Sequence, residues 1–275
     1  MSSDPATVAW WLLPLLMALL TGAMGGVAGP LLVVRRRVLH SNLIAHAVLP
    51  GVALAMATGI DPLLGGLASG LGVTWLAERL SSRRLPDDLG QEVVANTLLA
   101  ASLGLGVLLI QALDGDVDLN SLLFGDLLTA GPADLLRAGI ALAILLILVC
   151  GRYQQLVFLA VDPEGAAAAG LPVRRLQQLL SLATTLVIVS GMAAVGLILA
   201  IALYSAPAQI GLRTAASLCG ALGRSAAIGM AVAVGGFGLS LLLDSPPGPV
   251  IACLCVPLLL GSAAAPHRVG RRKDP

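Results

Sequence analysis

Apolar runs of about 20 residues make up most of the chain, and short stretches rich in glycine, proline and charge separate them. A run of this length is what a helix needs to cross the ~30 Å hydrocarbon layer of a membrane. The runs are continuous rather than alternating, which favours helices over barrel strands. The pattern therefore predicts an all-α, polytopic membrane helix bundle with about eight or nine transmembrane helices. The runs cover residues 8–34, 42–58, 63–77, 93–113, 135–150, 176–212, 226–243 and 250–262.

Two stretches do not fit a simple span. Residues 122–136, LLFGDLLTAGPADLL, are too polar and too rich in glycine and proline for an ordinary crossing, which indicates a short helix or a re-entrant piece covered by protein. Residues 176–212 are long enough for two crossings only if both are tight. Gly196 and Pro207 are the candidate breaks there, so we expect one full helix and one short or broken helix.

The distribution of charge predicts the orientation. If the loops alternate sides, one side collects nearly all the arginines and the other collects aspartates such as Asp61 and Asp244. Because basic loops stay in the cytoplasm, this segregation predicts nine crossings, with the N-terminus outside and the C-terminus inside. Residues 1–265 then form a single transmembrane domain, and residues 266–275 form a short basic cytoplasmic tail. Asp4, with no basic residue before Arg35, favours a retained first helix over a cleaved signal peptide.

Composition narrows the function classes. Only 11% of the residues are charged and the formal net charge is +1, so nucleic acid binding has no electrostatic basis. The four cysteines form no CxxC pair and are interpreted as small packing residues. Acidic residues of the outer loops would modestly raise the local concentration of an arriving cation. Abundant glycine and alanine favour close helix packing, although a GC-rich genome would give the same bias.

The segment RRRVLHSNLIAHAVLPG, residues 35–51, carries the candidate metal-ligating residues. Asn42 and His46 are four residues apart, so a helix presents both on one face. An ionisable imidazole at membrane depth is costly, which favours a polar pathway faced by His46 over a histidine satisfied by a neighbouring helix. Weaker pathway candidates are Asp126, which equally suits a helix cap, and Tyr204 and Ser205 beside Pro207, which equally suit packing.

A short cytoplasmic helix is predicted after the fifth run. Asp162 suits an N-cap, Pro163 the first helical position, Glu164 the first turn and Gly170 the terminating residue. Such a helix is either an ordinary connector or an element that transmits force from a soluble partner.

The chain shows no energy source of its own. It lacks the GxxxxGK[ST] phosphate loop, so any ATP hydrolysis belongs to another polypeptide. Glu78, Glu92 and Glu164 fall at predicted loops or helix ends, so no intramembrane carboxylates are available to relay protons. A membrane metalloenzyme would need more His, Asp or Glu in the spans.

Four segments together resemble one family. Residues 35–51, LLFGDLL at 122–128, VDPEGAAAAGLPVRRLQ at 161–177 and LLLDSPPGPVIA at 241–252 are similar in order and spacing to the permease subunits of ABC-3 metal importers. The family pattern has an aspartate where this chain has Asn42. A carboxylate suits a hard or borderline divalent cation, whereas an amide offers only a carbonyl dipole. The metal and the tightness of the site are therefore open.

The resemblance implies a type II ABC-importer-like permease in the cell membrane that moves zinc or manganese, with no permanently bound cofactor. Two copies would pair, bind ATPase subunits through the helix of Asp162, Pro163, Glu164 and Gly170, and receive metal from an extracytoplasmic solute-binding protein. His46 and Asn42 of both copies would then form a four-ligand site. The alternatives are a self-sufficient secondary transporter or channel, and an ABC permease for an iron chelate.

Overall fold

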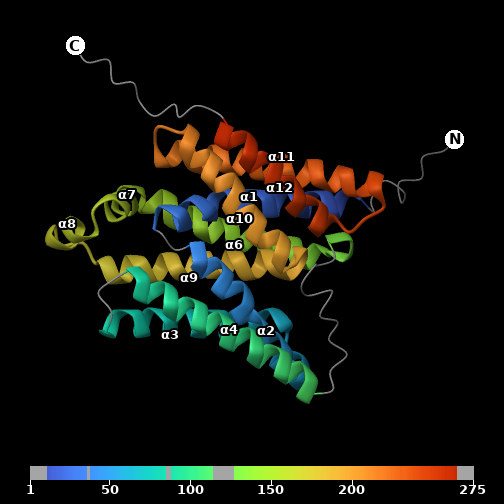
Figure 1. Ribbon diagram of the computed structural model, residues 1–275, viewed down its shortest axis with the longest axis horizontal. Helices are drawn as coiled ribbons and strands as arrows, with labels where there is room; N and C mark the ends of the chain where they lie inside the picture. The colour runs from blue at the N-terminus through green and yellow to red at the C-terminus, as the bar shows by residue number, and fades with distance from the viewer. Residues whose placement is uncertain (1–10, 36–37, 85–87, 114–126, 265–275) are drawn as a thin grey trace, which may run out of the picture.

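The computed structural model describes residues 11–35, 38–84, 88–113 and 127–264, and all regular structure within these ranges is helical (Figure 1). The nine long helices of this part of the chain lie side by side as a bundle. They are α1 (Leu12–Val34), α2 (Val38–Thr58), α3 (Pro62–Arg84), α4 (Asp88–Ala112), α6 (Pro132–Gly151), α9 (Val173–Val195), α10 (Leu197–Thr214), α11 (Leu218–Leu243) and α12 (Pro247–Ala264).

Each of these nine helices has 18 residues or more, which agrees with the nine crossings that the charge distribution predicts. Five of the described helices are both long and apolar enough to cross a membrane, namely α1, α2, α4, α6 and α11. The polytopic helical fold is thus confirmed. The basic tail, residues 266–275, lies outside the described residues.

The helices extend further than the apolar runs. Helix α3 continues to Arg84 and α4 begins at Asp88, so most of the expected charged loop is helical. Helix α11 begins at Leu218, eight residues before the predicted start at residue 226. Charged and small residues at the end of a span do not stop a helix that leaves the hydrocarbon, so hydropathy alone underestimates helix length.

The long run of residues 176–212 breaks once, at Gly196. The φ of Gly196 is 84°, in the region that favours glycine. This one residue separates α9 from α10. The expected break at Pro207 is wrong, because α10 continues through this residue. Proline leaves the carbonyl of Leu203 without its helical donor, and α1 approaches closely at that carbonyl through Gly25.

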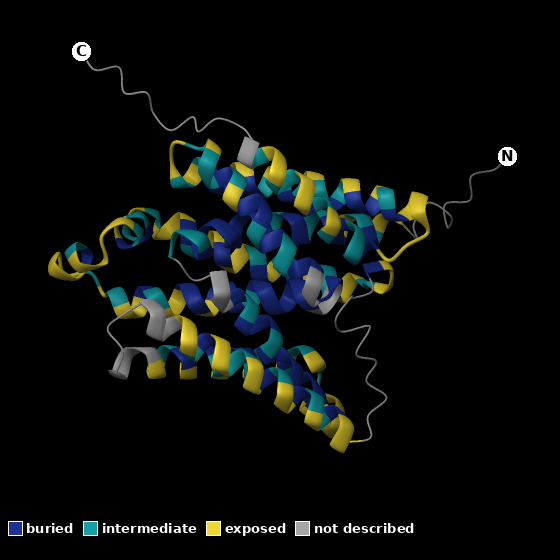
Figure 2. Ribbon diagram, in the orientation of Figure 1, coloured by how far each residue is buried: buried dark blue, intermediate teal, exposed yellow. Residues whose placement is uncertain are grey.

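Helix α1 is the centre of the main group of helices, where Figure 2 shows mostly buried residues. One glycine row, Gly22 and Gly26, meets Gly229 and Ala226 of α11 backbone to backbone. The other, Gly25 and Gly29, meets α10. A Cβ atom at any of these glycines would overlap main-chain atoms of the partner helix. This close packing is how helices associate without a hydrophobic driving force in lipid.

Helices α2, α3 and α4 form a second group at the lower edge of Figure 1. Gly51 of α2 and Gly65 of α3 bring these two backbones together, and Gly106 of α4 packs on Leu49 and Pro50 of α2. The group contacts the main bundle largely through α9, where Val189 lies against Gly66 and Gly70 of α3. Helix α9 is therefore the element shared by the two groups.

We expect Gly229→Ala to destabilise the protein, because its new Cβ atom would overlap the carbonyl of Gly22. Overpacking of this kind costs about 1–3 kcal/mol. The matched control is Gly235→Ala on the same helix, where no atom lies within 4 Å of a new Cβ. Thermal unfolding in detergent should show a lower midpoint for Gly229→Ala and an unchanged or higher one for Gly235→Ala. Equal midpoints would contradict the backbone contact.

Candidate metal pathway

Asn42 and His46 lie in the first half of α2 and are both half-buried, while residues 43–45 between them are buried. His46 and Val48 are two residues apart, about 200° around the helix. Since Val48 packs against Gly66 and Gly70 of α3, His46 lies on the opposite side of α2, away from α3. The two predicted ligands therefore share a face of α2 that does not pack on α3.

The Nδ1 atom of His46 is fully buried and has no hydrogen-bond partner among the described residues. Most buried polar atoms in proteins are paired, so such an atom needs an explanation. The histidine is thus not satisfied by a neighbouring helix through this nitrogen, which was the alternative open from the sequence. An imidazole with a free nitrogen in a mostly apolar helix suits a transient ligand for a transition metal.

Ser102 of α4 is a buried polar residue near the predicted ligands that the sequence did not single out. His46 and Pro50 are one turn apart, so His46 lies on the side of α2 that α4 crosses at Gly106. Ser102 is one turn before Gly106 on α4 and is 7% exposed. Helices α2 and α4 run in the same direction (Figure 1), so the turn of α4 that carries Ser102 lies beside the turn of α2 that carries His46. In the sequence, Ser102 is visible only as a serine within the apolar run of residues 93–113.

One copy of the chain provides few ligands. Within the described ranges, no group of three or more His, Cys, Asp or Glu side chains is placed to hold a metal ion. Asp126, the third predicted ligand, lies outside these ranges. The pair of Asn42 and His46 therefore needs donors from elsewhere to complete a coordination sphere.

Tyr204 and Ser205 make contacts within the protein. Tyr204 is buried, and its hydroxyl donates to the carbonyl of Val187 on α9 at 3.1 Å. Ser205 donates to the carbonyl of Ile201 one turn earlier at 2.9 Å. The Tyr204 bond joins α10 to α9, whereas the Ser205 bond lies within α10. The pathway role of Tyr204, Ser205 and Pro207 remains a prediction.

Glu78 lies within α3 and connects two helices. The hydroxyl of Ser181 on α9 donates to its Oε1 atom at 2.7 Å, six residues before α3 ends. The expectation that Glu78 falls in a loop or at a helix end is wrong, because α3 continues to Arg84. Its partner on α9 could not be predicted because the two residues are 103 positions apart.

The predicted short helix is present as α8 (Pro163–Ala168), at the far left of Figure 1. The backbone N–H of Gly165 donates to Oδ1 of Asp162 at 2.8 Å, as an N-cap requires. Pro163 and Glu164 occupy the first turn. Gly170, with a φ of 79°, ends the helix. Most of its residues are exposed, so α8 projects from the bundle (Figure 2).

Helix α7 (Tyr153–Val161) precedes α8 where the sequence predicted only a loop. Leu156 and Leu159, three residues apart, are buried on its inner side. The Tyr153 hydroxyl accepts a hydrogen bond from the N–H of Cys219 at the start of α11. The run was too short for a membrane span, and hydropathy therefore gave no signal for it. Helix α7 ties the base of α8 to the bundle.

The helical bundle defines a multi-pass membrane protein. The chain belongs to the ABC 3 transport family, which matches residues 11–265, and it is a permease of a metal ABC importer. The resemblance found in the sequence is thereby confirmed.

Individual relatives agree with this membership. The chain is 32% identical over 236 residues to the manganese transport system membrane protein MntC of Halalkalibacterium halodurans, covering 85% of this chain and 80% of that protein. It is 28% identical over 253 residues to the chelated iron transport system membrane protein YfeD of Yersinia pestis, covering 92% and 84%. Among solved structures, PsaBC from Streptococcus pneumoniae in complex with Fab is similar with a TM-score of 0.84 and 28% identity, covering 94% of this chain and 93% of that one.

We expect Asp162→Ala to loosen α8, because it removes the acceptor of the Gly165 N–H. Loss of such a cap costs about 1 kcal/mol. Asp162→Asn keeps an acceptor at this position and is the matched control. Amide hydrogen exchange of residues 163–168 should be faster in Asp162→Ala and close to wild type in Asp162→Asn. Equal protection in both variants would show that α8 does not depend on its cap.

Proposed function

We propose that the chain imports a divalent transition metal, with manganese as the favoured cargo. The observation that carries this proposal is the buried, unpartnered Nδ1 of His46, one turn from Asn42 on the same face of α2. Manganese is favoured over zinc because a relative with 32% identity is named for manganese transport. Amide oxygen is also a donor that suits manganese, whereas imidazole suits zinc and other transition metals.

The metal site is proposed to form between two copies of the chain. A two-fold axis beside α2 would bring two His46 and two Asn42 side chains together, giving four donors from two residues. Such a site carries no formal negative charge, so it binds a cation more weakly than a site with two carboxylates. Weak binding helps transport, because the ion must leave the site as well as reach it.

Energy and delivery are proposed to come from partners. An ATPase subunit would dock at α8, whose exposed residues and fixed ends suit a rigid contact. A solute-binding protein would deliver metal at the opposite end of the bundle. A self-sufficient secondary transporter is the competing class, and uptake that persists with a catalytically dead ATPase partner would favour it.

Chelated iron is the second candidate cargo, because the relative YfeD is named for it. A chelate presents the metal already ligated, so its transport would not need free donors at His46. Uptake of ferric chelate that is unaffected by His46→Ala would favour this cargo over a bare ion.

We expect His46→Ala to abolish uptake of radiolabelled manganese in cells that lack their own importer and express this chain with its partner subunits. Loss of one donor should reduce uptake at least about tenfold, the effect of a ~1.4 kcal/mol change in barrier. The matched control is His40→Ala, six residues earlier and about 240° around the same helix. Unchanged manganese uptake in His46→Ala would overturn the metal site.

We expect Asn42→Asp to change selectivity rather than abolish transport. The added carboxylate strengthens binding of divalent cations, so the apparent KM for manganese should fall. Slower release should also lower the maximal rate. Competition between labelled manganese and unlabelled zinc measures the selectivity. Identical kinetics and competition in the wild type and in Asn42→Asp would show that residue 42 does not contact the metal.

A further inference from the structure

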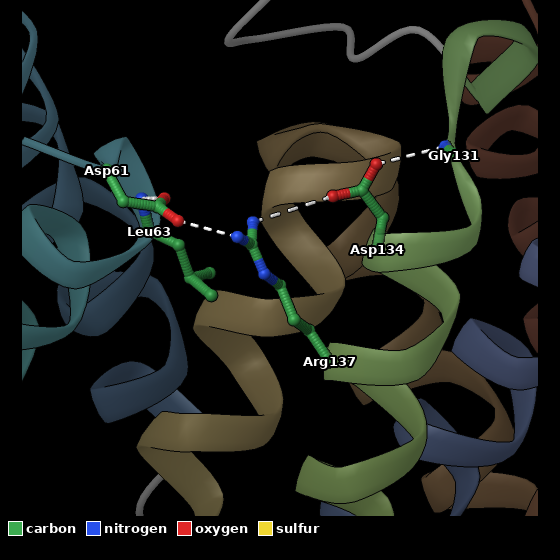
Figure 3. A network of polar contacts seen from close by, with 5 residues as sticks. All are labelled: Asp61, Leu63, Gly131, Asp134 and Arg137. Atoms are coloured by element: carbon green, nitrogen blue, oxygen red, sulfur yellow. Dashed lines mark hydrogen bonds and ion pairs between the residues drawn. The ribbon is translucent and has the colours of Figure 1, made fainter.

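An ion pair bridges the two groups of helices at their outward end (Figure 3). The guanidinium of Arg137 on α6 donates through Nη2 to Oδ2 of Asp61 at 2.6 Å. Asp61 lies in the turn between α2 and α3, whereas α6 belongs to the main bundle. Helix α9 packs against both α3 and α6, so the pair passes over the outer part of α9.

Both partners are held in place by further contacts. The Oδ1 atom of Asp61 accepts the backbone N–H of Leu63 at 2.9 Å and so caps the start of α3. Asp134, one turn before Arg137, accepts the N–H of Gly131 at 3.0 Å and lies 3.9 Å from the guanidinium. The two carboxylates thus flank one guanidinium, each fixed at the start of its own helix (Figure 3).

Arg137 lies on the outer side of the bundle, unlike the other basic residues of the chain. Of the 16 lysines and arginines in the sequence, the other 15 fall on the side of the bundle that the charge pattern assigns to the cytoplasm. A basic residue outside works against the positive-inside bias and would repel an arriving cation. Its pairing with Asp61 offsets both effects and supplies a reason for an arginine at this position.

We infer that the Asp61–Arg137 pair is a latch that holds the outward end of the permease closed and opens in each transport cycle. The pair is half-exposed, with side chains 34% and 44% accessible, so water replaces it at little cost when it opens. Opening separates the α2–α3 turn from α6 and uncovers the outer half of α3 beside α9. The inference rests on the proposed transport function.

The test measures closure directly. Leu67, one turn after Leu63, is partly buried against the core and serves as the reporter when changed to cysteine. The four native cysteines are first replaced by alanine. The full importer in membranes is then labelled with a membrane-impermeant maleimide, and the rate of labelling at residue 67 is recorded.

We expect Arg137→Gln and Asp61→Asn to label about twofold to fivefold faster than the parent, the range set by the strength of exposed ion pairs. Asparagine keeps the cap on α3, so this variant removes the charge alone. The double variant should label no faster than either single variant. Arg137→Lys keeps the positive charge and should label close to the parent.

Asp244→Asn is the matched control. It removes one outer negative charge at an exposed residue with a φ of 49°, a conformation that asparagine tolerates. We expect its labelling rate to match the parent. Acceleration equal to that of Asp61→Asn would make the effect one of general surface charge and overturn the latch.

Labelling of Arg137→Gln at the parental rate would also overturn the proposed latch. The readout needs no metal, so failure of the proposed cargo is a separate result. If the variants label as expected but the protein does not take up manganese, the proposed function is contradicted. If the protein transports manganese but the variants label at the same rate as the parent, the latch is contradicted.

Discussion

The structure depends on the close approach of α1 to α10 and α11. In lipid, apolar side chains gain little by leaving their surroundings, so helices must associate through main-chain contact and dense packing. Gly22 and Gly26 allow this on one side of α1, and Gly25 and Gly29 allow it on the other. With the backbones in contact, α1 becomes a rigid centre on which α10 and α11 are fixed. The group of α2, α3 and α4 has its own glycine contact at Gly51 and Gly65, and it meets this centre mainly through α9.

This division into two groups explains the surroundings of the candidate site. Helix α2 packs on α3 and α9 with one side and on α4 with the side that carries His46, yet Asn42 and His46 stay only half-buried within one copy. The buried Nδ1 of His46 then has no partner, which would be costly if the nitrogen served packing alone. In the proposed pair of copies, Asn42 and His46 act as metal ligands, and the second copy supplies the donors that one chain lacks.

Much of the fold could be predicted from the sequence because hydropathy reports burial in lipid directly. The long helices, the break at Gly196 and the capped helix of Asp162 followed from apolar runs, an isolated glycine and local capping chemistry. The predicted break at Pro207 was wrong because a proline breaks a helix only where nothing compensates for the lost hydrogen bond. Ser102, Glu78 and Arg137 could not be assigned, because their neighbours are set by tertiary contacts that no local pattern records. The candidate pair of Asn42 and His46 could be proposed from the sequence because both residues belong to one helix, and its role as a ligand pair stays a prediction.

The proposed site and the proposed latch share one physical requirement. A permease completes a cycle only if each interaction that forms is also broken, so tight binding at any step would slow transport. An amide at residue 42 weakens the ligation of the ion, and exposure of Asp61 and Arg137 to water weakens the ion pair. Burying the Asp61–Arg137 pair fully would make its separation expensive, since an uncompensated buried charge is far more costly than a solvated one. Moderate interactions at the two positions are therefore what a cycle driven by an external ATPase would need.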